Sequence, residues 1–197
     1  ANAVNLTRQQ YNLDSLPLKT VISYVGNGSR KLIQRSFRDL PQGDVESILN
    51  SYLKWYTENL IVETRLYPGV ERVLEKFQRM GAVMAVLSNK PGNLCRLFVD
   101  HFDLNHYFIR VLGAGDLSGL KPDPEGIYAV IDECRNQDIA VDVSRVWMVG
   151  DSDTDVNAAG RAGVNSVFCR FGFGQLNGAV PDHDIFLFEE LLALLSA

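Results

Sequence analysis

The chain has 197 residues, which is enough for one ordinary domain or for a core with a smaller attached module. Its composition, 46% hydrophobic and 22% charged, is typical of a globular protein, and its net charge of −5 argues against a nucleic-acid-binding surface. No apolar run approaches the ~20 residues that a membrane-spanning helix needs. The cysteines, Cys95, Cys134 and Cys169, are too widely spaced for a disulfide framework or a zinc site, so we expect buried, reduced thiols in a cytoplasmic protein.

Residues 1–66 predict a module built only of helices. In the clearest helix, apolar residues recur at every third or fourth position, and Asp44 stands where it can cap the first turn. The Gly26-Asn27-Gly28 turn separates two shorter helices, and Tyr67-Pro68-Gly69 ends the module. The expected helices cover residues 17–25, 29–37 and 44–60.

From residue 67 to residue 197, short apolar runs alternate with helical patterns. A run that is apolar throughout is typical of a strand in a parallel sheet that helices cover on both faces. We therefore expect an α/β fold, with a Rossmann-like parallel-sheet core over 67–197 and the helices of 1–66 attached as a cap. The expected strands cover residues 83–87, 108–112, 146–149 and 166–169, and a short edge strand with a closing helix is expected from about residue 182.

Polar residues that suit a phosphate group follow three of these strands. Ser88 and Asn89 come directly after the first strand, Lys121 lies on a proline-stiffened loop after the second, and three aspartates stand within residues 151–155 after the third. Each feature has a common structural explanation: a helix N-cap, a solvated lysine and an acidic turn. Ligands bind at the C-terminal ends of parallel strands, however, so these groups would meet at one edge of the sheet. Together they suit a phosphate–Mg²⁺ complex.

In this order, Ser-Asn-Lys after a strand, Lys-Pro-Asp-Pro, and Gly-Asp-Ser-x-x-Asp after a strand resemble the second, third and fourth motifs of the haloacid-dehalogenase (HAD) superfamily. The resemblance covers nearly the whole chain and implies a Mg²⁺-dependent hydrolase that works through an aspartyl-phosphate. It implies that Ser88 and the Asn89 backbone N–H bind the phosphoryl oxygens. Lys121 would be catalytic by stabilising their charge, and Asp151 would bind Mg²⁺. Asp155 would be the second catalytic residue, orienting Lys121 or a metal-bound water.

Within that superfamily, residues 23–28 followed by Leu32-Ile33 are similar to the cap of bacterial phosphoglycolate phosphatases. The similarity implies a phosphatase for a small phosphate monoester, with 2-phosphoglycolate as the expected substrate. The Gly26-Asn27-Gly28 turn, with Arg30 or Lys31 nearby, would meet the carboxylate of that substrate, although a solvated Arg30 is the simpler alternative. A sugar-phosphate phosphatase, a pyrophosphatase, a phosphomutase and a non-catalytic binding protein of the same fold stay open. No nucleic-acid or membrane partner is expected, and a homodimer is left open.

The first motif of the family, Asp-x-Asp-x-Thr, is absent from this sequence. The resemblance implies that its first aspartate attacks phosphorus and that its second transfers protons. We expect the chain to begin inside the helix after the first strand, and we expect that strand to be missing between the strands at 83–87 and 146–150. Three explanations stay open: a fragment of a full enzyme, a strand supplied by another chain or a rearranged segment, and a non-catalytic remnant. The polypeptide as given is predicted to hydrolyse no phosphate ester.

Overall fold

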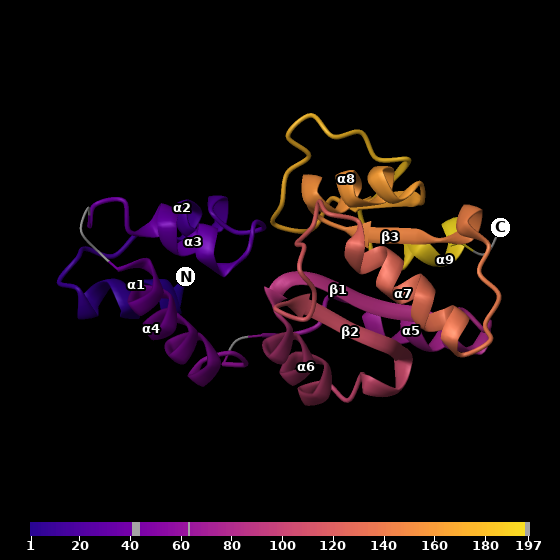
Figure 1. The fold of residues 1–197 in the computed structure, drawn as a ribbon, viewed down its shortest axis with the longest axis horizontal. Helices are drawn as coiled ribbons and strands as arrows, with labels where there is room; N and C mark the ends of the chain where they lie inside the picture. The colour runs from indigo at the N-terminus through magenta and orange to yellow at the C-terminus, as the bar shows by residue number, and fades with distance from the viewer. Residues whose placement is uncertain (41–43, 63, 196–197) are drawn as a thin grey trace.

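A computed structural model describes residues 1–40, 44–62 and 64–195 (Figure 1). The first four helices, which we call the helical lobe, are α1 (Asn2–Gln10), α2 (Leu18–Ser23), α3 (Ser29–Ser36) and α4 (Val45–Glu58). The later helices are α5 (Val70–Arg79), α6 (Gly92–His101), α7 (Glu125–Asn136), α8 (Asp153–Ala162) and α9 (Glu190–Leu195), with 3-10 turns η1 (Asn105–Tyr107) and η2 (Val143–Arg145). The strands are β1 (Met84–Pro91), β2 (Phe108–Ala114), β3 (Trp147–Gly150), β4 (Asn165–Cys169) and β5 (His183–Ile185). The predicted α/β class is confirmed.

The helical lobe packs around an apolar cluster of its own, which includes Val4 of α1 and Ile33 of α3. The helix α4 begins as predicted, because the Asp44 carboxylate accepts a hydrogen bond from the backbone N–H of Glu46 at 3.0 Å. The apolar stripe of α4 places Ile48 in the same cluster. The boundary proposed near residue 66 remains a prediction, although this cluster contains no residue from β1 onward.

Arg8, in α1, is a buried cation that joins distant parts of the helical lobe. Its side chain is 2% exposed and pairs with the Asp39 carboxylate at 2.5 Å. The same guanidinium donates to the carbonyl oxygen of Asp14 at 2.5 Å and to that of Ser36. The hydrogen bond from Arg8 holds the pKa of Asp39 below its usual range. One side chain thus satisfies acceptors from the loops that follow α1 and α3.

We expect Arg8→Met to lower the free energy of unfolding by about 2–4 kcal/mol, because it removes the donors of two carbonyls and the partner of Asp39. Urea unfolding of the purified protein measures this loss. The matched control is Arg38→Met, because Arg38 is exposed. Equal losses in the two variants would contradict the role given to Arg8.

The strands form two parallel sheets: β1 pairs with β2, and β4 pairs with both β3 and β5. Registered pairs include Val86 with Val111 and Val149 with Val167. On one face, α7 and α8 pack with Leu87 of β1 and Met148 of β3. On the other face, α5 and α9 pack in a cluster with Met84 of β1 and Trp147 of β3. Each of these clusters contains residues of both sheets, so β1 and β3 are the edge strands at which the two sheets face each other (Figure 1).

The two sheets do not join. In the described ranges no strand pairs with the second edge of β1 or of β3. Residues 84–87 of β1 and all of β3 are only partly buried, whereas residues 166–169 of β4 are buried. Central strands between two layers of helices are normally buried. The partial burial therefore agrees with an open strand position between β1 and β3, where the resemblance places the first strand of the family.

Candidate active site

Asn89 connects three segments at the C-terminal end of β1. Its side chain is buried, with the residue 8% exposed. The amide Nδ2 donates to the carbonyl oxygens of Lys121 at 2.8 Å and of Gly26 at 3.0 Å, and Oδ1 accepts from the backbone N–H of Lys121 at 2.8 Å. The neighbouring Ser88 Oγ accepts from the backbone N–H of Lys90 at 3.1 Å. The sequence pointed to the Asn89 backbone N–H, and it missed this positioning role of the side chain.

Lys121 is held rigidly between β1 and the segment after β3. Its ammonium lies 2.7 Å from Asp155 Oδ1 and donates to the carbonyl oxygen of Leu87 at 2.6 Å. The side chains of Lys121 and Asp155 are 10% and 7% exposed. The prolines beside Lys121 and the Asn89 bridge fix the loop that carries it. The result is a fixed positive charge at the strand ends, as predicted for stabilising a phosphoryl group.

Asp155 holds Lys121 with one oxygen and the start of α8 with the other. Its Oδ2 accepts from the backbone N–H of Ser152 at 3.0 Å and from the Ser152 hydroxyl at 2.7 Å, which forms a capping box. A Cβ at Gly150 would collide with this carboxylate. Of the two roles predicted for Asp155, its geometry favours the orientation of Lys121.

Asp151, at the end of β3, points to the loop that follows β4. Its Oδ2 accepts from the backbone N–H groups of Phe173 at 2.8 Å and Gly174 at 3.0 Å. The loop approaches so closely that a Cβ at Gly172 would collide with the Asp151 side chain. From the sequence alone, residues 171–174 could either line the mouth of the site or form a plain loop, and the structure places this segment against Asp151.

Two buried cysteines, Cys95 and Cys169, lie close to the predicted site residues. Burial raises the pKa of Cys95, although a hydrogen bond with Ser88 and the charges of Lys90 and Lys121 act in the opposite direction. Burial, with the charge of Asp151 and then that of Asp155, raises the pKa of Cys169 to about 12. The predicted residues of the strand ends therefore surround two buried cysteines.

Arg30 lies apart from this group. Its guanidinium forms an ion pair with the Glu46 carboxylate, and its side chain is 54% exposed. The structure therefore brings together Ser88, Asn89, Lys121 and Asp155, with Asp151 beside them, and it leaves Arg30 paired within the helical lobe. A role of Arg30 in substrate binding stays a prediction.

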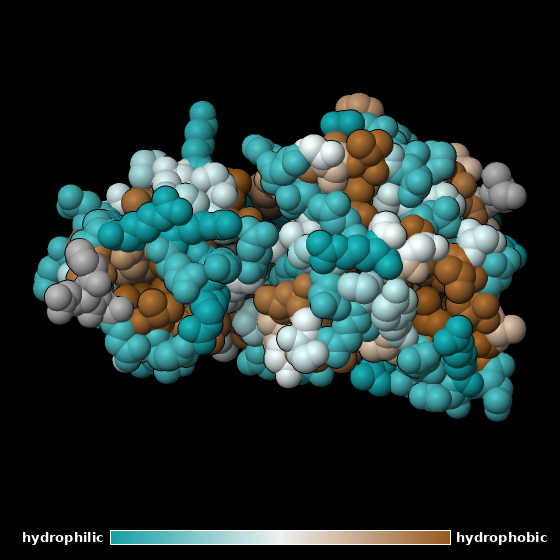
Figure 2. Space-filling view, turned by 45° about the horizontal axis from the view of Figure 1, so that its top comes forward, coloured by the Kyte–Doolittle hydropathy of each residue, from teal (hydrophilic) through white to brown (hydrophobic). Residues whose placement is uncertain are grey.

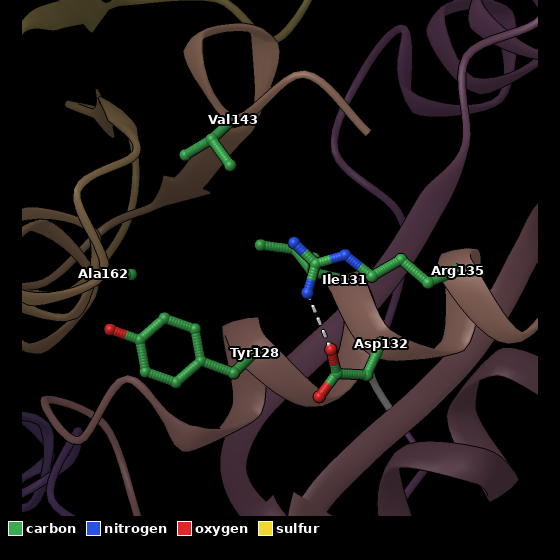
Figure 3. Close-up of a pocket in the computed structure, with 6 residues that line it drawn as sticks. All are labelled: Tyr128, Ile131, Asp132, Arg135, Val143 and Ala162. Atoms are coloured by element: carbon green, nitrogen blue, oxygen red, sulfur yellow. Dashed lines mark hydrogen bonds and ion pairs between the residues drawn. The ribbon is translucent and has the colours of Figure 1, made fainter. Parts of the chain in front are cut away.

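The pocket in Figure 3 is a different place. It is lined from α7, η2 and α8 and has a volume of about 410 Å³; its lining residues are Tyr128, Ile131, Asp132, Arg135, Val143 and Ala162. Arg135 and Asp132 pair with each other at 3.0 Å on neighbouring turns of α7. None of the predicted site residues lines it, so we place the active site at the strand ends.

A parallel α/β layer with a helical lobe, whose strands end in Ser-Asn, a buried lysine and an aspartate pair, defines a hydrolase of the HAD type. The chain matches the haloacid dehalogenase-like hydrolase family over residues 1–169, and it belongs to that family.

Several of its relatives carry the name phosphoglycolate phosphatase. The chain is similar to phosphoglycolate phosphatase from Neisseria meningitidis serogroup A, with 34% identity over 89% of this chain and 75% of the relative. It is also similar to phosphoglycolate phosphatase from Haemophilus influenzae strain 86-028NP, with 28% identity over 100% of this chain and 89% of the relative. Among solved structures, a predicted phosphoglycolate phosphatase from Haemophilus somnus 129PT superposes with a TM-score of 0.86 at 26% identity, covering 98% and 89% of the two chains. The predicted superfamily, fold class and phosphatase class are confirmed.

Proposed function

We propose that the protein hydrolyses a small phosphate monoester that carries a carboxylate, with 2-phosphoglycolate as the substrate. The names of the relatives support this choice of substrate. The observation that carries the proposal is the fixed ammonium of Lys121, held beside Ser88 at the strand ends between Leu87 O and Asp155. A phosphoryl group placed there would accept hydrogen bonds from Ser88 Oγ and the Asn89 N–H. Lys121 would offset its negative charge, and Asp155 would keep Lys121 in place.

Asp151 fits one particular kind of metal. Its Oδ2 is fixed by two backbone N–H groups, and residues of the described ranges donate no hydrogen bond to its Oδ1. The same ranges hold no group of three or more His, Cys, Asp or Glu residues suited to a metal ion. A single carboxylate suits Mg²⁺, which keeps several waters and takes oxygens from substrate phosphate. When bound, Mg²⁺ would supply positive charge to the phosphoryl oxygens.

The nucleophile is the part of the chemistry that the described residues do not supply. The family resemblance calls for an aspartate on a strand between β1 and β3, and that position is open in the described part of the chain. Asp151 and Asp155 are both engaged by other groups at the strand ends. We infer that an attacking aspartate would have to occupy this open strand position, within reach of Lys121.

The 197-residue polypeptide is accordingly expected to show no Mg²⁺-dependent hydrolysis of p-nitrophenyl phosphate above background, whereas the product of the complete reading frame hydrolyses it. A colorimetric assay of both proteins at equal concentration makes the comparison, and circular dichroism reports whether each is folded. Turnover by the 197-residue polypeptide would show that its own residues complete the site.

The cellular environment and the partners of the enzyme are also proposals. Cys95, Cys134 and Cys169 are free and buried, which supports a reducing, cytoplasmic environment. Among the described residues, no helix has the length and apolar character required to cross a membrane. The net charge of −5 argues against a nucleic-acid partner. A homodimer is left to measurement by light scattering.

A further inference from the structure

Lys90 is a cation without an acidic partner. Its ammonium lies 3.8 Å from the ring centre of Phe98 in α6 and 5.2 Å from that of Tyr56 in α4. No carboxylate in the described ranges pairs with it, and burial lowers the pKa of its amine. Aromatic faces attract a cation but leave it able to bind an anion. A partly buried ammonium without a counter-ion is costly to a fold.

Lys90 lies at the junction between the helical lobe and the end of β1. It follows Ser88 and Asn89 directly, and its backbone N–H donates to Ser88 Oγ at 3.1 Å. Its side chain reaches Tyr56, so it lies where the helical lobe meets the rest of the chain. Asn89 binds the carbonyl oxygen of Gly26 at the same junction. Figure 2 shows the surface indented where the two parts meet.

We infer that the Lys90 ammonium binds the carboxylate of the substrate at the junction of the helical lobe and the sheet. This inference rests on the proposed phosphatase function. A substrate whose phosphoryl group lies between Ser88 and Lys121 would extend from the strand ends toward the lobe, and the Lys90 ammonium lies on that side between Phe98 and Tyr56. Lys90 then takes the role that the sequence analysis gave to Arg30, which is already paired with Glu46.

The charge of Lys90 makes the inference testable by pH. Burial lowers the pKa of Lys90 from 10.5 to about 8. The titratable groups that face the amine are Tyr56, whose pKa burial raises to about 12, and Cys95, whose pKa burial raises above 9.0. Both of these groups are neutral near pH 8. A preference for a carboxylate ligand should therefore fall as the pH rises above about 8 and Lys90 loses its proton.

The test compares 2-phosphoglycolate with ethyl phosphate, which has a methyl group in place of the carboxylate. Equilibrium dissociation constants are measured by calorimetry without Mg²⁺, so that neither ligand is hydrolysed, on the product of the complete reading frame, with Lys90→Met, Lys90→Arg and, as a matched control, the exposed Lys54→Met. We expect Lys90→Met to weaken binding of 2-phosphoglycolate about 30-fold and to change binding of ethyl phosphate less than about 3-fold. Lys90→Arg should recover part of the preference, and Lys54→Met should retain all of it.

A wild-type protein that binds the two ligands equally, or a preference that Lys90→Met leaves unchanged, overturns the inference. An equal loss for both ligands in Lys90→Met also overturns it, because it identifies Lys90 as a structural contact. Hydrolysis of p-nitrophenyl phosphate by the wild-type protein is measured separately. That assay tests the proposed phosphatase function, whatever the two dissociation constants show.

Discussion

Replacing Lys121 by alanine is expected to lower kcat at least ~100-fold, in line with the removal of one group that stabilises the transition-state charge. The Lys121 ammonium is held by Asp155 Oδ1 and Leu87 O, so it is already placed and desolvated before a substrate arrives. A fixed, desolvated charge stabilises the transition state more than the same charge in water does, because the groups around it need little reorganisation during the reaction. The measurement is steady-state hydrolysis of 2-phosphoglycolate by the product of the complete reading frame.

The same substitution leaves the Asp155 carboxylate buried without its partner, so Lys121→Ala also threatens the fold. A second variant separates the two effects: Lys121→Ala with Asp155→Asn removes both charges and should regain stability without regaining activity. The exposed Lys76→Ala serves as the control for loss of a lysine. Near-normal kcat in folded Lys121→Ala would contradict the role assigned to this ammonium.

Asp151→Asn is expected to lower kcat at least ~100-fold and to raise the Mg²⁺ concentration needed for half-maximal activity. Asparagine has the size of aspartate, and its amide oxygen can still accept from the N–H groups of Phe173 and Gly174. The loop should therefore stay in place while the charge is lost. Magnesium titrations of the wild type and the variant, followed by activity, measure both effects.

Asp153→Asn is the matched control, because Asp153 pairs with the Asn177 side chain at 3.0 Å and lies two positions away from Asp151. It should keep most of the activity and an unchanged Mg²⁺ requirement. If Asp151→Asn retained wild-type activity and Mg²⁺ dependence, Asp151 could not be the metal ligand proposed here.

The parts of the fold that the sequence predicted are those set by local patterns. The apolar stripe around Ile48 and the cap at Asp44 depend on residues within a few positions of one another, and α4 follows them. Strand ends were predictable for a related reason. Apolar runs stop where polar residues begin, and parallel strands bring their C-terminal ends to one edge, which places Ser88, Lys121 and Asp155 together.

The parts that the sequence did not predict depend on contacts between distant segments. Asn89 binds Gly26, 63 positions away, and Asp151 binds Phe173, 22 positions away. Neither spacing has a local signature. The ion pair between Arg30 and Glu46 is another contact that the sequence did not predict, and the role of Arg30 in substrate binding stays a prediction. Lys90 stood in a recognised motif, yet its unpaired state is visible only in three dimensions.

The open position between β1 and β3 has a clear physical consequence. Unpaired backbone groups cost about 1–3 kcal/mol each when they are buried, and a domain is held together by only ~5–15 kcal/mol. The partial exposure of both strands reduces that cost, because water can reach the free groups. The two sheets are held next to each other by the apolar clusters that they share, one with α5 and α9 and the other with α7 and α8.

A crystal structure of the product of the complete reading frame with Mg²⁺ and inorganic phosphate tests the central claim most directly. The account predicts phosphate oxygens within hydrogen-bonding distance of Ser88 Oγ and Lys121 Nζ, with the metal bound to the Asp151 carboxylate. Phosphate and metal bound at another place, such as the pocket between α7 and α8, with the strand ends holding neither, would contradict it.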